Sequence, residues 1–457
     1  MPPQLALLLG FILVYAAFRS DRSRHYPDTQ DLFFPTLWYL VVTTHPIGYW
    51  CQLWGIPIPN DSADATEGSP IDRYFFLTLT IFGLRILAKR HFSWGPALRA
   101  NRPLITLLAF MALSIAWSQY PFVSLKRFVK VFGSLVMALV ILSQPNPLDA
   151  FTTVLRRTLY IHLPMSLICT RYFREIGVSF DWSGATEAWC GIATTKNVLG
   201  QVAMLGALYF SAQIRQHWHL FHWRNLHVLY LLIALFLLKG AGSISLTSVA
   251  VCAFSLLIFF RIHSLRSTPA AIPAFVKKVF FTTTALITLV LVHSVTLFSA
   301  DSIFGHLITL FGRDITLTDR TFIWSDVYAA AGGFTLTGVG YGGFWIGRIS
   351  NIPWNATMTW VLGQAHSGYI DTYLQIGWIG ALLLASLIFS SIPVLLSDLS
   401  KDFDFAALRI TLFLTILFIN ITESTFLRGD HHLWLILLLV LWKMPAPSLP
   451  KSSFSPT

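Results

Sequence analysis

One histidine lies where the chain could carry out acid–base chemistry beside a membrane. His366, with the hydroxyl of Ser367 next to it, comes directly before a long apolar segment that begins at about residue 368. It follows a glycine-rich segment, GVGYGGFW, at 338–345. Imidazole changes its protonation near neutral pH. A histidine at this place can therefore move a proton next to a lipid-borne substrate, which a buried core histidine cannot do.

Cationic residues could bind an anionic ligand near this histidine. Lys196 and Asn197 begin an apolar segment, and the start of a helix attracts anions through its free N–H groups and its dipole. Arg320 begins a short amphipathic segment, 321–328, and a guanidinium can bind two phosphate oxygens at once. These residue types indicate a site for a membrane-anchored anion.

Hydroxyl side chains follow in the segment GSISLTS at 242–248. Ser243 and Thr247 are four residues apart, with Ser245 between them, and residues at that spacing share one face of a helix. Small residues of this kind also pack helices together in membranes. The pattern is therefore typical either of helix packing or of a polar cavity that binds a phosphate or a sugar.

The composition requires most of the chain to contact lipid. Hydrophobic residues make up 55% of the 457 residues and charged residues 12%, whereas soluble domains carry about 25% charged residues. A helix needs roughly 20 apolar residues to cross the hydrocarbon core. Segments that reach or approach this length lie at about 2–18, 32–54, 71–88, 103–117, 122–142, 154–170, 197–213, 226–240, 244–262, 279–298, 368–396, 407–422 and 431–443. We therefore predict an all-α, polytopic membrane protein with about 12–13 transmembrane helices.

The charges of the loops predict the topology. Basic residues of short loops stay in the cytoplasm, which places the N-terminus outside and the C-terminal tail inside. Against this rule, a set of cations falls at or near the outer face: Lys126, Arg127, Lys130, Arg171, Arg174, Lys196, Lys239, Arg313, Arg320, Arg348 and Arg428. A polyanionic ligand would explain them. Alternatively, some reach the headgroups or pair with acids such as Glu187 and Glu423.

We expect a single transmembrane domain over residues 1–445 and a disordered tail over 446–457. The longest external segment, 300–365, contains the amphipathic segment and the glycines and ends before His366. Long loops of this kind are usually functional, and its aromatic residues favour a lid that lies on the membrane surface. This helical lid is expected to bear the active site.

Other chemistries find little support. Four cysteines lack any CxxC or metal spacing and are expected to be small apolar side chains. The glycine-rich segment lacks the lysine and the strand–helix setting of a nucleotide loop, so tight turns or close approach of a ligand explain it better. The net charge of +11 is not attributed to nucleic acid, because no soluble basic module carries it. We expect no metal and no cofactor.

Six motifs taken in chain order resemble those of one family. They are WCGIATTKNVLG (189–200), SISLTS (243–248), LTDRTFIW (317–324), GVGYGGFW (338–345), AHSGYID (365–371) and NITES (420–424). Together they resemble the O-antigen ligase and polysaccharide polymerase superfamily, especially its exopolysaccharide-production branch, over about residues 100–445. The chain departs from the family pattern at Cys190, Thr195, Asp319 and Ser367, where the family usually has Arg, His, Gly and Asn.

The resemblance implies a GT-C-like, metal-independent, inverting glycosyltransferase of the bacterial inner membrane, with its active site on the periplasmic side. It implies a glycan donor on undecaprenyl diphosphate, a glycan or lipid A-core as acceptor, and surrounding membrane lipids. His366 would be the general base, and Arg320, with Lys196, would compensate the diphosphate charge. Further residues expected to bind the substrate or its diphosphate are Asn197, Ser243, Ser245, Thr247, Arg127, Tyr369 and Glu423.

Three functions stay open at this point. The SISLTS and GVGYGGFW patterns favour a polymerase, which joins one carrier-linked repeat to another. A ligase, which hands the glycan to lipid A-core, is the main alternative. A transporter or flippase is the alternative of another class, and it is disfavoured because the distinctive residues gather on one membrane face rather than at mid-membrane.

Overall fold

The computed structural model describes residues 1–22, 30–57, 69–90, 94–180, 187–216, 221–242, 246–296, 320–331, 335–347 and 363–443. Within these ranges the regular structure is helical apart from one antiparallel hairpin of β1 (Val178–Phe180) and β2 (Glu187–Trp189), in which Val178 lies opposite Trp189. The prediction of an all-α, polytopic membrane protein is confirmed. The expected tail at 446–457 and much of the expected lid lie outside the described residues.

The helices differ widely in length. In chain order they are α1 (Pro3–Arg22), η1 (Gln30–Leu32), α2 (Phe33–Thr43), α3 (Ile47–Leu53), α4 (Pro70–Lys89), α5 (Trp94–Ala100), α6 (Arg102–Ser114), η2 (Ile115–Trp117), α7 (Pro121–Leu142), α8 (Pro147–Tyr172), α9 (Arg174–Gly177), α10 (Lys196–Gln216), α11 (Phe221–Gly242), α12 (Leu246–Ser264), α13 (Ala271–Thr296), α15 (Arg320–Ala330), α16 (Phe344–Gly347), α18 (Gly368–Asp398), α19 (Phe403–Ile419) and α20 (His432–Leu441).

By length and composition, three described helices could cross a membrane: Pro3–Asp21, Ala271–Val292 and Gly368–Asp398. A fourth is the sharply bent pair Trp94–Ala100 and Arg102–Trp117, if it forms one span. Several other expected spans form helices that are shorter over the described residues or carry several charges, as α7 does with Lys126, Arg127 and Lys130. The count of 12–13 spans therefore stays a prediction.

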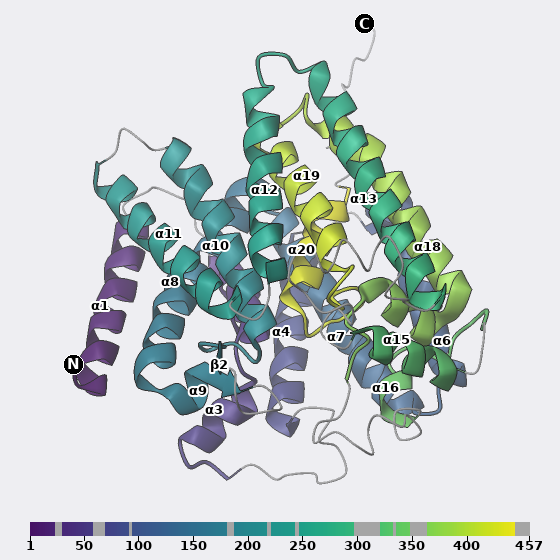
Figure 1. Cartoon of the computed structure of the whole chain (residues 1–457), viewed down its shortest axis with the longest axis horizontal. Helices are drawn as coiled ribbons and strands as arrows, with labels where there is room; N and C mark the ends of the chain where they lie inside the picture. The colour runs from purple at the N-terminus through teal and green to yellow at the C-terminus, as the bar shows by residue number, and fades with distance from the viewer. Residues whose placement is uncertain are drawn as a thin grey trace, which may run out of the picture.

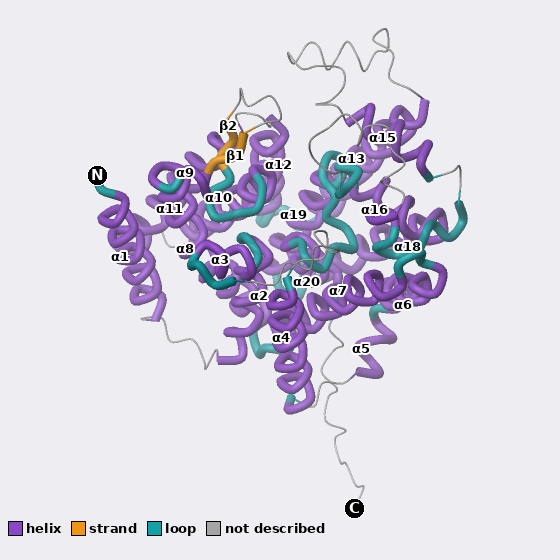
Figure 2. Tube along the Cα trace, turned by 90° about the horizontal axis from the view of Figure 1, so that it is seen from below, coloured by secondary structure: helices purple, strands orange, loops and turns teal. Residues whose placement is uncertain are grey.

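The long helices form one bundle, and several of the short elements lie at the same end of it. α10 packs along α11, α4 along α7, α18 along α6 and α12 along α19. The short elements α3, α9, α15 and α16 lie at the lower end in Figure 1, whereas the C-terminal side of α18 lies at the upper end. Seen from below in Figure 2, the β-hairpin lies beside α9. The bundle thus presents irregular backbone at one of its two ends.

A break in α18 leaves backbone groups free to form hydrogen bonds with the glycine-rich segment. Gly377 has φ 65° and ψ −164°, and Ile376 is also non-helical. Backbone groups that the break frees then pair with the segment that begins at residue 335. Val339 and Gly340 donate to the carbonyls of Leu374 and Gln375 at 3.4 and 3.0 Å, and Trp378 and Ile379 donate to Thr335 and Leu336 at 3.2 and 3.0 Å. The segment is therefore fixed along α18.

Glycine is required where the two backbones meet. Gly338 and Gly377 both have positive φ, and a Cβ on either would overlap backbone atoms of the other's segment. Only glycine adopts such φ values without strain. Tight turns were expected of this segment, and the close approach it permits is to the protein's own helix.

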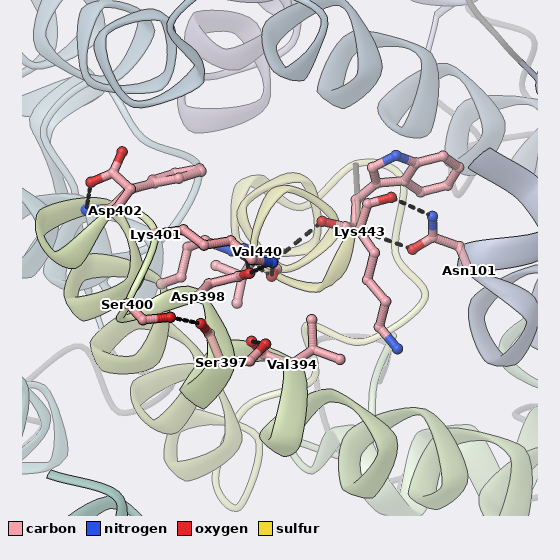
Figure 3. A network of polar contacts seen from close by, with 12 residues as sticks. Asn101, Val394, Ser397, Asp398, Ser400, Lys401, Asp402, Val440 and Lys443 are labelled. Carbon is pink, nitrogen blue, oxygen red and sulfur yellow. Dashed lines mark hydrogen bonds and ion pairs between the residues drawn. The ribbon is translucent and has the colours of Figure 1, made fainter. Parts of the chain in front are cut away.

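Polar contacts join the helices at the opposite end of the bundle, where Figure 3 shows Asp398, Val440 and Lys443, and the buried Arg409 lies among them. Arg409 donates to the Val440 carbonyl from Nε at 2.9 Å and to the Trp442 carbonyl at 3.2 Å, and its Nη1 lies 2.8 Å from Asp398 Oδ2. Carbonyls at a helix C-terminus have no partner within the helix. One guanidinium therefore satisfies the end of α20 and links it to α18 and α19.

This geometry predicts that Arg409→Ala destabilises the protein by about 3 kcal/mol, because it leaves two buried carbonyls at the end of α20 without a donor and removes the buried cation beside Asp398. The measurement is the midpoint of thermal unfolding of the purified protein in detergent. Lys401→Ala is the matched control, since Lys401 binds the same Asp398 at 2.9 Å but is 73% exposed, and exposed pairs contribute little. Equal midpoints for the two variants would contradict the assignment.

Candidate active site

The backbone at His366 is held in an uncommon conformation. His366 has φ 51°, a region that non-glycine residues seldom adopt. The preceding residue is fixed on both sides: Trp324 Nε1 donates to the Ala365 carbonyl at 2.8 Å, and the Ala365 amide donates to Asp371 Oδ1 at 3.1 Å. Helices α15 and α18 therefore determine how His366 is presented, and such local strain is typical of functional sites.

The Asp371 side chain connects three segments around His366 through hydrogen bonds. Its Oδ1 also accepts a hydrogen bond from Trp345 Nε1 at 3.0 Å, and the carboxylate is buried. The same oxygen thus connects α16, the residue before His366 and the first turn of α18. These contacts give Asp371 a positioning role.

The loop that follows α19 is folded around Asn420. The side-chain oxygen of Asn420 accepts hydrogen bonds from the amides of Thr425 and Phe426 at 3.0 and 3.2 Å. The carbonyls of Asn420 and Glu423 both accept from the Gly368 amide, at 3.0 and 3.1 Å. The loop is therefore docked onto the first residue of α18, two residues after His366.

This docking brings a carboxylate to the histidine. Glu423 Oε2 lies 3.7 Å from His366 Nδ1, and the two side chains are 14% and 21% exposed. Asn197, the second residue of α10, donates to Glu423 Oε1 at 2.8 Å. Within the described part of the chain, no hydrogen bond or ion pair forms at the other ring nitrogen, Nε2. The imidazole thus has a carboxylate beside Nδ1, and no described residue is bound at Nε2.

A second chain of polar contacts reaches the same ring nitrogen. Gln364 Nε2 lies 3.3 Å from His366 Nδ1, and Arg428 Nη1 donates to Gln364 Oε1 at 3.0 Å. Arg428 also binds Asp430 at 3.4 Å. Asp430 is half-exposed, and the cations Arg428 and Lys130 hold the pKa of its carboxyl below its usual range. Asp430 therefore stays ionised and anchors Arg428.

Two helices begin beside this cluster with a cation. Lys196 is the first residue of α10 and is half-buried, directly before the Asn197 that binds Glu423. Arg320 is the first residue of α15, four residues before Trp324 and hence about 6 Å from it along the helix axis. The side chain of Arg320 lies outside the described residues. Both helix starts add positive potential near His366.

The other predicted ligand residues lie in different settings. Arg127 donates to the Gly342 carbonyl at 2.6 Å, and the Tyr369 hydroxyl donates to the Leu417 carbonyl at 3.0 Å. Ser243 and Ser245 lie outside the described residues, as does the side chain of Thr247 in α12. Over the described part of the chain, no cluster of three or more His, Cys, Asp or Glu residues suits a metal ion.

Sequence reasoning did not foresee the arrangement around Nδ1. It placed Glu423 among the ligands of the substrate, whereas the structure also places its carboxylate against His366. It gave Gln364 no role and treated Arg428 only as an outer-face cation. The signals were present: Gln364 is two residues from His366, and Arg428 with Asp430 puts opposite charges beside an apolar segment.

Comparisons with known proteins support the class of enzyme that the motifs indicated. Residues 226–385 match a family model described as O-Antigen ligase. This range includes Arg320 and His366 and ends before Glu423. The match supports the predicted assignment to the O-antigen ligase and polysaccharide polymerase superfamily and, with it, a membrane glycan-transfer function.

A curated relative supports the same assignment. The chain is 26% identical over 299 residues to the "Exopolysaccharide production protein ExoQ" of Rhizobium meliloti (strain 1021). The match covers 63% of this chain and 65% of the relative, so the chain spans just under two thirds of the relative's length. No solved structure matches the chain.

The docking of the loop on α18 predicts that Gly368→Ala lowers glycan-transfer activity at least about tenfold. A Cβ at this position would overlap the Asn420 side chain and contact Phe426 at 3.0 Å, which would displace Glu423 from His366. The measurement is turnover of purified enzyme with a lipid-linked glycan. Gly363→Ala is the control, because a Cβ there meets none of the described residues within 4 Å. A fully active Gly368→Ala enzyme would contradict this role of the docked loop.

Proposed function

We propose that this protein is a metal-independent, inverting glycosyltransferase that uses a lipid-linked glycan donor. It moves the glycan from undecaprenyl diphosphate to an acceptor hydroxyl at the periplasmic face of the bacterial inner membrane. The observation that carries the proposal is the His366–Glu423 pair at 3.7 Å, near the places where α10 and α15 begin with Lys196 and Arg320.

The first part of the reaction is activation of the acceptor. Nε2 of His366 takes the proton of the acceptor hydroxyl as its oxygen attacks the anomeric carbon. The imidazolium that forms is stabilised by the Glu423 carboxylate behind it, which Asn197 holds in place at 2.8 Å. General base catalysis of this kind contributes about 10²- to 10⁴-fold.

The second part is departure of the carrier. The bond from the anomeric carbon to the diphosphate oxygen breaks on the side opposite the attack, so the configuration inverts. The diphosphate leaves with its charge compensated by Arg320 and Lys196, and no general acid is needed. Neither a metal nor a cofactor takes part in these steps.

Further contacts to the carrier are proposed for the hydroxyls of Ser243, Ser245 and Thr247. Arg127 and Tyr369 are the remaining candidates. Each already binds a backbone carbonyl, that of Gly342 or Leu417, and would have to exchange this bond for a substrate oxygen. The segment 300–365 is proposed as the lid, and its described parts support this: Trp324 and Trp345 hydrogen-bond beside His366.

The acceptor decides between two activities of one site. A polymerase is favoured because the curated relative is an exopolysaccharide production protein. A ligase remains the alternative because the matching family model is described as O-Antigen ligase. The products of a defined undecaprenyl-diphosphate oligosaccharide, with and without lipid A-core, distinguish them: a ladder of longer glycans indicates polymerisation, and glycosylated lipid A-core indicates ligation.

In that assay His366→Ala is expected to lower turnover at least about 100-fold, because the base is lost. Arg320→Lys is expected to lose most activity, because an ammonium group cannot donate the two parallel hydrogen bonds that a guanidinium donates to phosphate oxygens. His263→Ala is the control; His263 lies near Asp404 at 3.5 Å, away from the loop that carries His366. Wild-type turnover of His366→Ala would overturn the proposed chemistry. Movement of the donor across the membrane with no new glycosidic bond would indicate a transporter instead.

A further inference from the structure

We propose that Gln364, held by Arg428, is a positioning residue that decides which ring nitrogen of His366 carries the proton. Gln364 and Glu423 compete for the same nitrogen, Nδ1, and only the contact with Glu423 leaves Nε2 able to accept a proton. The inference rests on the proposed function, in which His366 is the base, and it adds a means of controlling that base.

The first step is the orientation of the Gln364 amide. A guanidinium has donors only, so the group 3.0 Å from Arg428 Nη1 must be the amide oxygen, Oε1. Turning the amide over would place its NH2 against the guanidinium, donor against donor. Arg428 is itself held by the ionised Asp430. The orientation of Gln364 is therefore set by chemistry.

The second step follows at the other end of the amide. With Oε1 facing Arg428, the NH2 group faces His366 Nδ1 at 3.3 Å. An amide NH2 donates and cannot accept, so Nδ1 must supply the lone pair. A neutral imidazole carries one proton, which then lies on Nε2. In this state Nε2 offers a donor, and the ring cannot act as a base there.

The third step concerns Glu423. Its Oε2 lies 3.7 Å from the same Nδ1, which is beyond a hydrogen bond and about 0.7 Å longer than a normal one. A carboxylate only accepts, so a short approach would require the proton on Nδ1. That tautomer frees the lone pair of Nε2 and makes His366 competent as a base. Asn197 holds the other oxygen of Glu423 and keeps the carboxylate within reach.

The two states exclude each other, because Nδ1 either accepts from Gln364 or donates to Glu423. The ground-state geometry favours the contact with Gln364, since 3.3 Å is within hydrogen-bonding range and 3.7 Å is not. The Arg428–Gln364 pair therefore restrains the base in the absence of substrate. Weakening this restraint should raise the fraction of base-competent enzyme.

The test compares Gln364→Met and Gln364→Glu with wild type. Met removes the donor at similar size, and kcat should rise about threefold to tenfold, the ratio that one net hydrogen bond represents. Glu accepts from both Arg428 and Nδ1–H, so kcat should also rise, while the acidic limb of the kcat–pH profile moves to higher pH because a new carboxylate favours the imidazolium. Loss of activity or no change in both variants, with an unmoved pH limb, would overturn the inference.

A readout independent of turnover uses histidine labelled with nitrogen-15, with the His366 signals identified by their loss in His366→Ala. Wild type should show the proton on Nε2, and Gln364→Glu should show it on Nδ1. The same tautomer in both proteins would overturn the inference even if Gln364→Met fails to fold. Full activity of His366→Ala would instead refute the proposed function, so the two failures are distinguishable.

Discussion

The site depends on one backbone amide. The N–H of Gly368 donates to the carbonyls of both Asn420 and Glu423, and this double contact joins the start of α18 to the loop after α19. The absence of a side chain at Gly368 leaves room for Asn420, whose amide group in turn shapes the loop. His366 lies on one side of this junction and Glu423 on the other. The geometry of the proposed dyad is therefore set by backbone contacts rather than by its own charges.

The negative and positive groups around His366 lie in different places. A carboxylate and an amide approach Nδ1, whereas the cationic starts of α10 and α15 lie nearby. An anionic substrate would therefore be attracted to the helix starts, while the proton of a neutral acceptor would move towards the histidine and its carboxylate. In the proposed mechanism, this separation would allow one site to hold a diphosphate and still deprotonate a hydroxyl.

Much of the fold could be predicted from apolar segments alone. The predicted segment 368–396 corresponds to α18 (Gly368–Asp398), and 122–142 corresponds to α7 (Pro121–Leu142). Such segments are local, and length with hydropathy defines them. The break at Gly377 was not predicted, because its reason is the distant segment that binds there. For the same reason the glycine-rich segment could be assigned to tight turns but not to its partner.

The candidate site was predictable only in part. His366 was identified by its place before an apolar segment, which is local information. Its contact with Glu423 joins residues far apart in the chain and depends on the docked loop. The outer-face cations illustrate the same limit: Arg174 pairs with Glu187, an acid that the alternative of ion pairing named, and Arg428 pairs with Asp430, which it did not name. Sequence could not indicate which cation remains available to a ligand.

The most direct test of the dyad is the steady-state turnover of Glu423→Gln with a defined undecaprenyl-diphosphate oligosaccharide. This variant keeps the size of the side chain and can still bind Asn197 through its amide oxygen, but it removes the charge that stabilises the imidazolium. If Glu423 supports His366 as a base, kcat falls about 100-fold while KM for the donor changes less than about threefold. A kcat equal to that of the wild type would contradict a catalytic His366–Glu423 pair.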